Sequence, residues 1–225
     1  MALRATVFDF DGVIVNSEPL HYRALHDALL TEEVQITEDE YWSSFLAYDN
    51  RGAIRRALDL HDEPVDPDRV ERLAGHMVTR FGELIPEIPV YPGAPELVRA
   101  MADEMPLAIA SGARGEEVDA ILRSVGLRDA FVTIVGAEDA PRTKPDPAPY
   151  LEATRRLAAQ GNGLSPSDCV AFEDTMPGIA AALAAGLTVV GVAHTYPADK
   201  LQAAHRVVDC VGDIDVNTLR GLFGD

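Results

Sequence analysis

The sequence predicts an α/β protein in which a doubly wound, mostly parallel, Rossmann-like sheet forms the core and a helical cap domain is inserted into it. The first observation is that short apolar segments alternate with amphipathic ones between residues 93 and 192, as repeated βα units with right-handed crossovers require. The second is that residues 37–85 show helical periodicity only. We therefore expect a core of residues 1–15 and 90–225 and a helical cap domain of residues 16–89.

The composition limits the class of protein. Of the 225 residues, 47% are hydrophobic, which is enough for a globular protein with a substantial core. The chain has no run of about 18 apolar residues and starts without a signal-peptide pattern, so we expect a cytoplasmic protein. Its two cysteines, Cys169 and Cys210, do not indicate a disulfide scaffold or a structural zinc site. A formal charge of −18 disfavours nucleic acids and anionic membranes as partners, but it does not reveal a high-salt habitat or the oligomeric state.

The first predicted elements are a strand and an amphipathic helix. Leu3–Phe8 is short and apolar at its end, as expected of a central strand. A helix should start near Glu18, capped by Ser17 or Asn16, with Pro19 tolerated in its first turn. Its apolar positions recur at helical spacing. They are Leu20, Ala24, Leu25, Ala28 and Leu29.

The predicted cap domain continues with three more helices. One opens at Thr37–Glu40, the next runs from Asn50 as its cap through Leu58, and the third runs from Asp66 through Leu84. Three prolines follow within seven residues and should end the helical stretch as a stiff connection. They are Pro86, Pro89 and Pro92.

The remaining chain alternates between helices and strands. Glycines directly after two of the predicted helices supply the left-handed conformation that helix ends favour. The predicted helices are Pro95–Glu104, Glu116–Val125, Asp146–Ala159 and Pro177–Ala185. The predicted strands are Leu107–Ala110, Phe131–Val135, Cys169–Phe172 and Thr188–Val192.

Polar side chains follow four of the predicted strands. Because the carboxyl ends of parallel strands meet at one edge of the sheet, we expect these side chains to converge although they are far apart in sequence. Several carboxylates so close together cannot all stay ionised without a cation. The residues are Asp9 and Asp11, Ser111 and Gly112, Lys144, and Glu173 and Asp174.

The residue types at this edge predict a phosphoryl-transfer site. Oxygen ligands without histidine or cysteine favour Mg²⁺ over zinc. A metal ion, a lysine and a hydroxyl together neutralise and orient a phosphoryl group. Taken singly, each feature has an ordinary structural explanation. The carboxylate pair could form a turn closed by Gly12, and Asp174 with Thr175 could cap a helix. Ser111 could be an ordinary hydroxyl at a strand end, and Lys144 could be a solvated charge. Their combination in this order favours the site.

Four motifs in this order resemble those of the haloacid dehalogenase superfamily, and specifically its phosphatase and β-phosphoglucomutase-like branch with a helical cap. The match spans most of the predicted core. The motifs are Asp9-Phe-Asp11-Gly-Val, Ser111-Gly112, Lys144-Pro-Asp-Pro and Glu173-Asp174-Thr-x-x-Gly178.

The resemblance implies a role for each carboxylate. Asp9 would attack phosphorus and form an aspartyl-phosphate. Asp11 would protonate the leaving oxygen and then accept a proton from the hydrolytic water. Asp9, the backbone carbonyl of Asp11, and Asp174 would hold Mg²⁺, with Glu173 supporting the metal through water. The carboxylate at Asp11 also argues against dehalogenation, which needs no proton donor for its leaving group.

The resemblance also implies residues that bind the phosphoryl group and the rest of the substrate. Ser111, Gly112 and Lys144 would contact the transferring phosphoryl oxygens. Lys144 is one of only two lysines beside seventeen arginines, which fits a need for a compact point charge. On the cap, His21 and Arg51 match substrate-contacting positions, although each is equally compatible with an ordinary surface residue.

Departures from the mutase pattern favour hydrolysis. The cap positions at which the mutases carry lysines are here Ala47 or Tyr48, after Leu46, and the neighbourhood of Met77. Without these lysines a second phosphate would bind less well. We therefore expect a Mg²⁺-dependent phosphatase acting on a small phosphorylated metabolite such as a sugar phosphate. The alternatives are a β-phosphoglucomutase-like phosphosugar mutase and, from another class, a signalling domain phosphorylated on aspartate.

Overall fold

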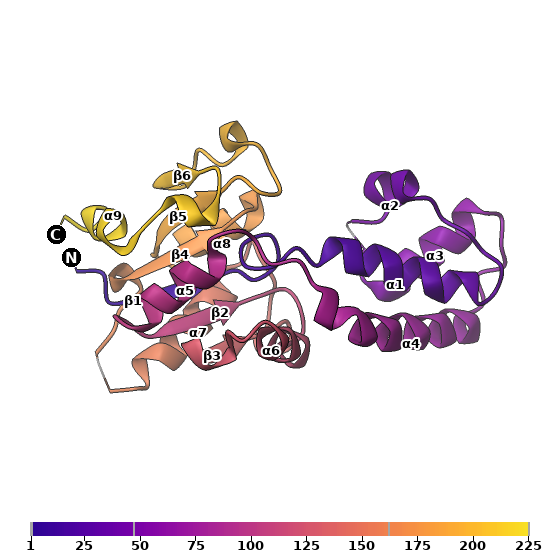
Figure 1. The fold of residues 1–225 in the computed structure, drawn as a ribbon, viewed down its shortest axis with the longest axis horizontal. Coiled ribbons are helices and arrows are strands. Elements are labelled where there is room, and N and C mark those ends of the chain that lie inside the picture. The colour runs from indigo at the N-terminus through magenta and orange to yellow at the C-terminus, as the bar shows by residue number, and fades with distance from the viewer. Residues whose placement is uncertain (1, 47, 162, 225) are drawn as a thin grey trace. The chain divides into compact units, whose positions relative to one another are not determined.

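The computed structural model describes residues 2–46, 48–161 and 163–224 and divides into two compact units (Figure 1). The core unit comprises Met1–Asn16 and Pro89–Asp225, and the helical unit comprises Ser17–Ile88. The chain passes between the two units after residues 16 and 88, and each of these points lies one residue from the boundary expected from the sequence. Ala47, one of the two positions considered for a missing cap lysine, lies outside the described residues.

The core unit is built on a parallel sheet with strand order β3-β2-β1-β4-β5-β6, which confirms the predicted doubly wound α/β class. The last strand was not predicted, because it has only three residues and its exposure changes at each of them, so it offers no usable periodicity. The strands are β1 (Ala5–Phe8), β2 (Leu107–Ala110), β3 (Phe131–Val135), β4 (Cys169–Glu173), β5 (Thr188–Val192) and β6 (Arg206–Val208).

Helices cover the sheet of the core unit (Figure 1). Helix α7 packs on β1, β2 and β3, and α8 packs on β4 and β5. Buried side chains of both helices, such as Tyr150 and Ile179, share one apolar core with Val7 and Val189 of the strands. The helices of this unit are α5 (Ala94–Ala102), α6 (Gly115–Ser124), α7 (Ala148–Ala158), α8 (Met176–Ala184) and α9 (Val216–Gly221).

The strand register determines which residues lie at the same level where the strands end. Phe8 at the end of β1 is level with Ile109 of β2 and with Phe172 of β4. The three strands are buried along their whole length, so their first polar residues emerge at the same carboxyl edge. The polar residues that follow these strands therefore lie at one edge of the sheet.

The described residues of the helical unit form four α-helices, with α4 packed against α1 and α3. Its helix starts are set by short polar side chains. Thr37 and Glu40 form a reciprocal capping box, and the Asp66 side chain accepts from the backbone N–H of Arg69 at 3.0 Å. The helices are α1 (Glu18–Leu30), α2 (Glu38–Ser44), α3 (Asn50–Leu60) and α4 (Pro67–Leu84).

One predicted cap in the helical unit is wrong, and another lies at the predicted position but makes no capping hydrogen bond. Helix α3 is capped by Asp49, whose carboxylate accepts from the N–H of Gly52 at 2.7 Å, and Asn50 is already its first residue. Asp49 has the extended backbone that a capping residue needs. Ser17 occupies the N-cap position of α1, but its backbone is helical and its side chain makes no capping hydrogen bond.

Within the described residues, no helix is both long enough and apolar enough to cross a bilayer.

Candidate active site

Asp9 and Lys144 form a buried ion pair at the end of β1. The Asp9 carboxylate oxygen Oδ1 lies 2.8 Å from the Lys144 ammonium and accepts the backbone N–H of Phe10 at 2.7 Å. Burial, followed by the charge of Glu173, raises the pKa of Asp9 well above its usual range, and Lys144 partly offsets this. The ionised carboxylate therefore depends on nearby positive charge.

Glu173, the last residue of β4, is completely buried and has partners on both carboxylate oxygens. Its Oε1 accepts from the Lys144 ammonium at 2.7 Å and from the Tyr150 hydroxyl at 2.8 Å. Its Oε2 accepts from the N–H groups of Asp174 and Thr175 at 3.1 and 3.2 Å and from the Thr175 hydroxyl at 3.0 Å. Although burial opposes ionisation, Lys144 and these hydrogen bonds lower the pKa of Glu173. Glu173 thus anchors Lys144.

Gly178 of α8 explains the glycine of the fourth motif. A Cβ atom at this position would lie 1.8 Å from Glu173 Oε1 and 2.1 Å from Oε2. Only a residue without a side chain leaves room for this buried carboxylate.

Asp174 has one engaged and one unengaged carboxylate oxygen. The Thr195 hydroxyl donates a hydrogen bond to Oδ2. In the described part of the chain, Oδ1 is buried and has no hydrogen-bond partner. Burial, together with the charge of Glu173, raises the pKa of Asp174 to about 7. An unpaired buried oxygen is costly unless a cation or proton compensates it.

These carboxylates form a cluster that fits a small divalent cation. One oxygen each from Asp9, Glu173 and Asp174 lies within 4.8 Å of the others, and all three residues are buried. Gly12 packs closely against the cluster, because a Cβ atom there would lie 1.9 Å from Asp174 Oδ2. Hard cations such as Mg²⁺ prefer oxygen ligands. The cluster offers carboxylate oxygens, and among the described residues Asp174 Oδ1 has no other partner. The close approach of the Gly12 backbone agrees with a compact site.

Ser111, Gly112 and Lys144 line one small cavity of the core unit. Ser111 is buried, and its hydroxyl oxygen accepts the N–H of Ala113 at 3.0 Å. The structure therefore brings together a hydroxyl, a glycine and an ammonium from separate segments. Asp11 is partly buried, and its charge, after burial, contributes to raising the pKa of Glu117 on α6 to about 7.

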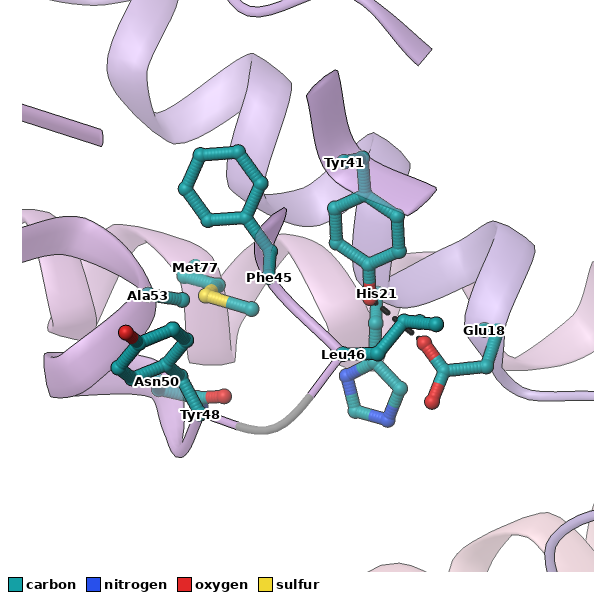
Figure 2. A pocket seen from close by; sticks show the side chains of 9 residues that line it. All are labelled: Glu18, His21, Tyr41, Phe45, Leu46, Tyr48, Asn50, Ala53 and Met77. Carbon is teal, nitrogen blue, oxygen red and sulfur yellow. Dashed lines mark hydrogen bonds between the residues drawn. The ribbon is translucent and has the colours of Figure 1, made fainter. Parts of the chain in front are cut away.

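His21 lines a cavity of about 110 Å³ inside the helical unit (Figure 2). Its ring stacks on Phe81 at a centroid distance of 4.3 Å, and burial lowers its pKa. Glu18 and Tyr41 face the same cavity, joined by a hydrogen bond of 2.7 Å from the phenol to the carboxylate (Figure 2). Met77, noted in place of a mutase lysine, also lines it.

Arg51 is not among the residues that line this cavity. Its guanidinium makes two hydrogen bonds to the Glu71 carboxylate, at 2.5 Å from Nε and 2.8 Å from a terminal nitrogen. Both side chains are more than half exposed. Its charge is thus locally neutralised by Glu71.

Sequence reasoning missed three residues of the core site, which are Tyr150, His194 and Thr195. Tyr150 had no signal, because it looks like an ordinary apolar position of a helix. His194 and Thr195 lie two and three residues after the end of β5, and polar residues after a fifth parallel strand could have marked them. His194 stacks on Tyr91 at a centroid distance of 3.8 Å.

The comparisons agree with this geometry. A family model described as haloacid dehalogenase-like hydrolase matches residues 3–186, so the chain belongs to this family and is a hydrolase. The resemblance inferred from the four motifs is thereby confirmed.

Individual relatives cover most of the chain. Protein CbbY of Rhodobacter capsulatus is 33% identical over 84% of this chain and 85% of that protein. Fructose-1-phosphate phosphatase YqaB of Escherichia coli is 30% identical over 83% of this chain and 94% of that protein. A solved variant of CbbY from Rhodobacter sphaeroides, in complex with xylulose 1,5-bisphosphate, is 25% identical with a TM-score of 0.80 and covers 97% of this chain and 99% of that one.

Proposed function

We propose that this hydrolase is a Mg²⁺-dependent phosphatase that cleaves a small phosphorylated metabolite through an aspartyl-phosphate. The observation that carries the proposal is the buried cluster in which Asp9 pairs with Lys144 while Asp174 keeps one oxygen without a partner. A nucleophile, an electrophilic anchor and a cation site are the parts that phosphoryl transfer needs.

Asp9 is the proposed nucleophile. Both contacts of its carboxylate fall on Oδ1, so we assign Oδ2 to the attack on phosphorus. The new Oδ2–P bond forms as the ester P–O bond breaks, and Asp11 gives its proton to the leaving oxygen. Asp11 then takes a proton from water as the water oxygen displaces Asp9 and releases inorganic phosphate.

The other core residues bind and orient. Lys144 and Ser111, with the backbone at Gly112, are proposed to hold the phosphoryl oxygens. Bound Mg²⁺ would neutralise charge on the phosphoryl group and orient it toward the nucleophile. Asp9, the backbone carbonyl of Asp11 and Asp174 are proposed to hold the ion. Glu173 would support it through water, as well as anchoring Lys144.

The helical unit supports a substrate whose far end is uncharged and rich in hydroxyl groups. The lining of its cavity offers the Glu18 carboxylate, the phenols of Tyr41 and Tyr48 and the Asn50 amide, but no lysine or arginine (Figure 2). A carboxylate repels a second phosphate and accepts hydrogen bonds from hydroxyls. A sugar monophosphate has the groups that this lining can bind. The sequence similarity to a fructose-1-phosphate phosphatase supports the same substrate class. We assign His21, which lines this cavity, as a substrate contact. We keep Arg51, which lies outside the lining and is paired with Glu71, as a second proposed contact.

A mutase is the second candidate, because one similar structure was solved with a sugar bisphosphate. Mutases must hold a second phosphate, and no lysine or arginine is among the described residues that line the cavity of the helical unit. This lining favours the phosphatase.

A panel of phosphorylated sugars and sugar alcohols, assayed with Mg²⁺ for released phosphate and for isomerised product, tests the proposal. We expect phosphate release from monophosphates, dependence on Mg²⁺, and no turnover by the Asp9→Asn variant. Isomerisation of a hexose 1-phosphate in the presence of a bisphosphate primer would establish the mutase instead. Full turnover by Asp9→Asn would refute both assignments.

A further inference from the structure

We propose that Thr195 and His194, the residues that follow β5, are positioning residues of the active site. Thr195 fixes the Asp174 carboxylate with one oxygen directed to the cation, and His194 fixes the Gly12 backbone beside it. The inference rests on the proposed metal-dependent function and adds two side chains from a strand that contributes no motif.

The Thr195 hydroxyl and the Asp174 carboxylate form a directional contact. Because the hydroxyl donates to Oδ2, it removes one of the two oxygens from competition for a cation and limits rotation of the carboxylate. The oxygen that remains, Oδ1, is buried without a partner in the described chain. Groups that hydrogen-bond to a ligating carboxylate orient it and tune its affinity for metal.

His194 holds the segment that carries the first motif. Its Nδ1 lies 2.8 Å from the carbonyl oxygen of Gly12, and since a carbonyl only accepts, Nδ1 carries the hydrogen. Burial lowers the pKa of His194, which keeps the ring in the neutral form with a single N–H. Stacking on Tyr91, with 13° between the ring planes, sets the direction of that N–H.

The hydrogen bond from His194 stabilises the backbone conformation of Gly12. Its φ of +78° places the backbone in the left-handed region, and its N–H donates to the Val15 carbonyl at 2.9 Å. His194 engages the carbonyl of the same residue, so both peptide groups around Gly12 are held. The segment therefore stays against Asp174, where a Cβ atom would collide with Oδ2.

Thr195 has little reason to be kept for packing. The residue is exposed overall, yet its hydroxyl bonds to a carboxylate with 2% exposure. Substitutions of exposed side chains usually leave the packing of the core unchanged. Its replacement should therefore alter metal binding without unfolding the protein.

The decisive experiment measures Mg²⁺ binding directly, by calorimetry and by Mg²⁺-dependent thermal stabilisation, in full-length variants. We expect Thr195→Val to weaken the apparent Mg²⁺ affinity by about 10- to 100-fold, the range for lost support of a metal ligand, and Thr195→Ser to restore most of it. Thr79→Val in the helical unit removes a hydroxyl that bonds to the Gly75 carbonyl at 3.0 Å and should leave Mg²⁺ affinity unchanged.

His194 is tested by a pair of variants. His194→Phe keeps the stacking on Tyr91 and removes the N–H, whereas His194→Asn retains a donor. We expect Mg²⁺ affinity to fall in the first and to recover in part in the second. If His194→Phe does not fold, His194→Asn is compared with His194→Ala instead. Equal Mg²⁺ affinities of these two variants would show that the N–H group has no role.

The outcomes separate this inference from the proposed function. Wild-type Mg²⁺ affinity in Thr195→Val, in a protein that hydrolyses phosphate esters with Mg²⁺, overturns the positioning role and leaves the phosphatase assignment intact. Failure of the wild-type protein to bind Mg²⁺ overturns both. Hydrolysis lost by Asp9→Asn with Mg²⁺ affinity reduced by Thr195→Val supports both.

Discussion

A Cβ atom on Gly178 would lie 1.8 Å from the buried Oε1 atom of Glu173. Replacing a helical glycine by alanine usually stabilises a protein by about 0.5–1 kcal/mol. Here the added methyl must displace a carboxylate that holds Lys144 and Tyr150. We expect Gly178→Ala to lower the free energy of unfolding by about 1–3 kcal/mol and to reduce activity.

Gly75 in α4 is the matched control, because nothing lies within 4 Å of a Cβ atom there. Gly75→Ala should raise the stability that chemical denaturation measures, opposite in sign to Gly178→Ala. Equal effects at the two glycines would show that the close approach to Glu173 does not matter.

The proposed nucleophile should lower the stability of the protein when no divalent cation is present. The pKa of Asp9 is raised by burial and then by Glu173, so its ionised form at neutral pH is less favourable in the folded state than in the unfolded state. In EDTA, Asp9→Asn should therefore raise the free energy of unfolding at neutral pH, while Lys144 keeps its ion pair with Glu173. The same variant should lose at least about 10³-fold in kcat.

Replacing Asp27 by asparagine should change the stability in the opposite direction to Asp9→Asn. Burial raises its pKa, but the Arg80 hydrogen bond and charge outweigh this and lower it overall. Asp27→Asn should therefore destabilise the protein, by no more than about 1 kcal/mol because the pair is partly exposed. A destabilised Asp9→Asn would mean that the ion pair with Lys144 outweighs the burial of charge.

Glu71 should restrain Arg51 in substrate selection. Both side chains are more than half exposed and screened by solvent, so Glu71→Gln should leave the stability of the protein nearly unchanged. Freeing the guanidinium should lower KM for a sugar bisphosphate relative to a monophosphate by about fivefold, because the unpaired positive charge attracts the second phosphate. Glu83→Gln, which breaks the 2.9 Å pair with Arg80, serves as the control and should leave the ratio unchanged.

Glu152 on α7 should make stability depend on acid. The hydrogen bond from Arg155, with a further one from Arg156, lowers its pKa from 4.5 to about 2 against the effect of burial. A lowered carboxylate pKa contributes stability that is fully present above the unfolded value near 4.5 and is lost as pH falls through about 2. Glu152→Gln should thus cost about 1 kcal/mol at pH 7, with the difference shrinking below about pH 4.5.

Denaturation of both proteins at pH 7, 4 and 3 measures this dependence. A difference between wild type and Glu152→Gln that stays constant over this range would show that the carboxylate charge is not the source of the stabilisation.

Much of the core could be predicted from the sequence because its signals are local. Alternating apolar segments define a parallel sheet wherever strands are buried on both faces, and residues after such strands must meet at one edge. Asp9, Lys144 and Asp174 were placed in one site by this reasoning alone. The same local reasoning mistook Asn50 for a cap, because the choice between it and Asp49 depends on backbone conformation.

Only the tertiary structure decided how the carboxylates differ from one another. Glu173 and Asp174 are neighbours in sequence, yet both carboxylate oxygens of Glu173 are engaged, whereas Asp174 Oδ1 has no hydrogen-bond partner among the described residues. The difference comes from Tyr150 and Thr195, which reach the site from separate segments. Hydrogen bonds between distant residues depend on packing and register, and no periodicity or motif encodes them locally. The sequence therefore determined which chemistry gathers at the sheet edge, and the fold decided which oxygen performs it.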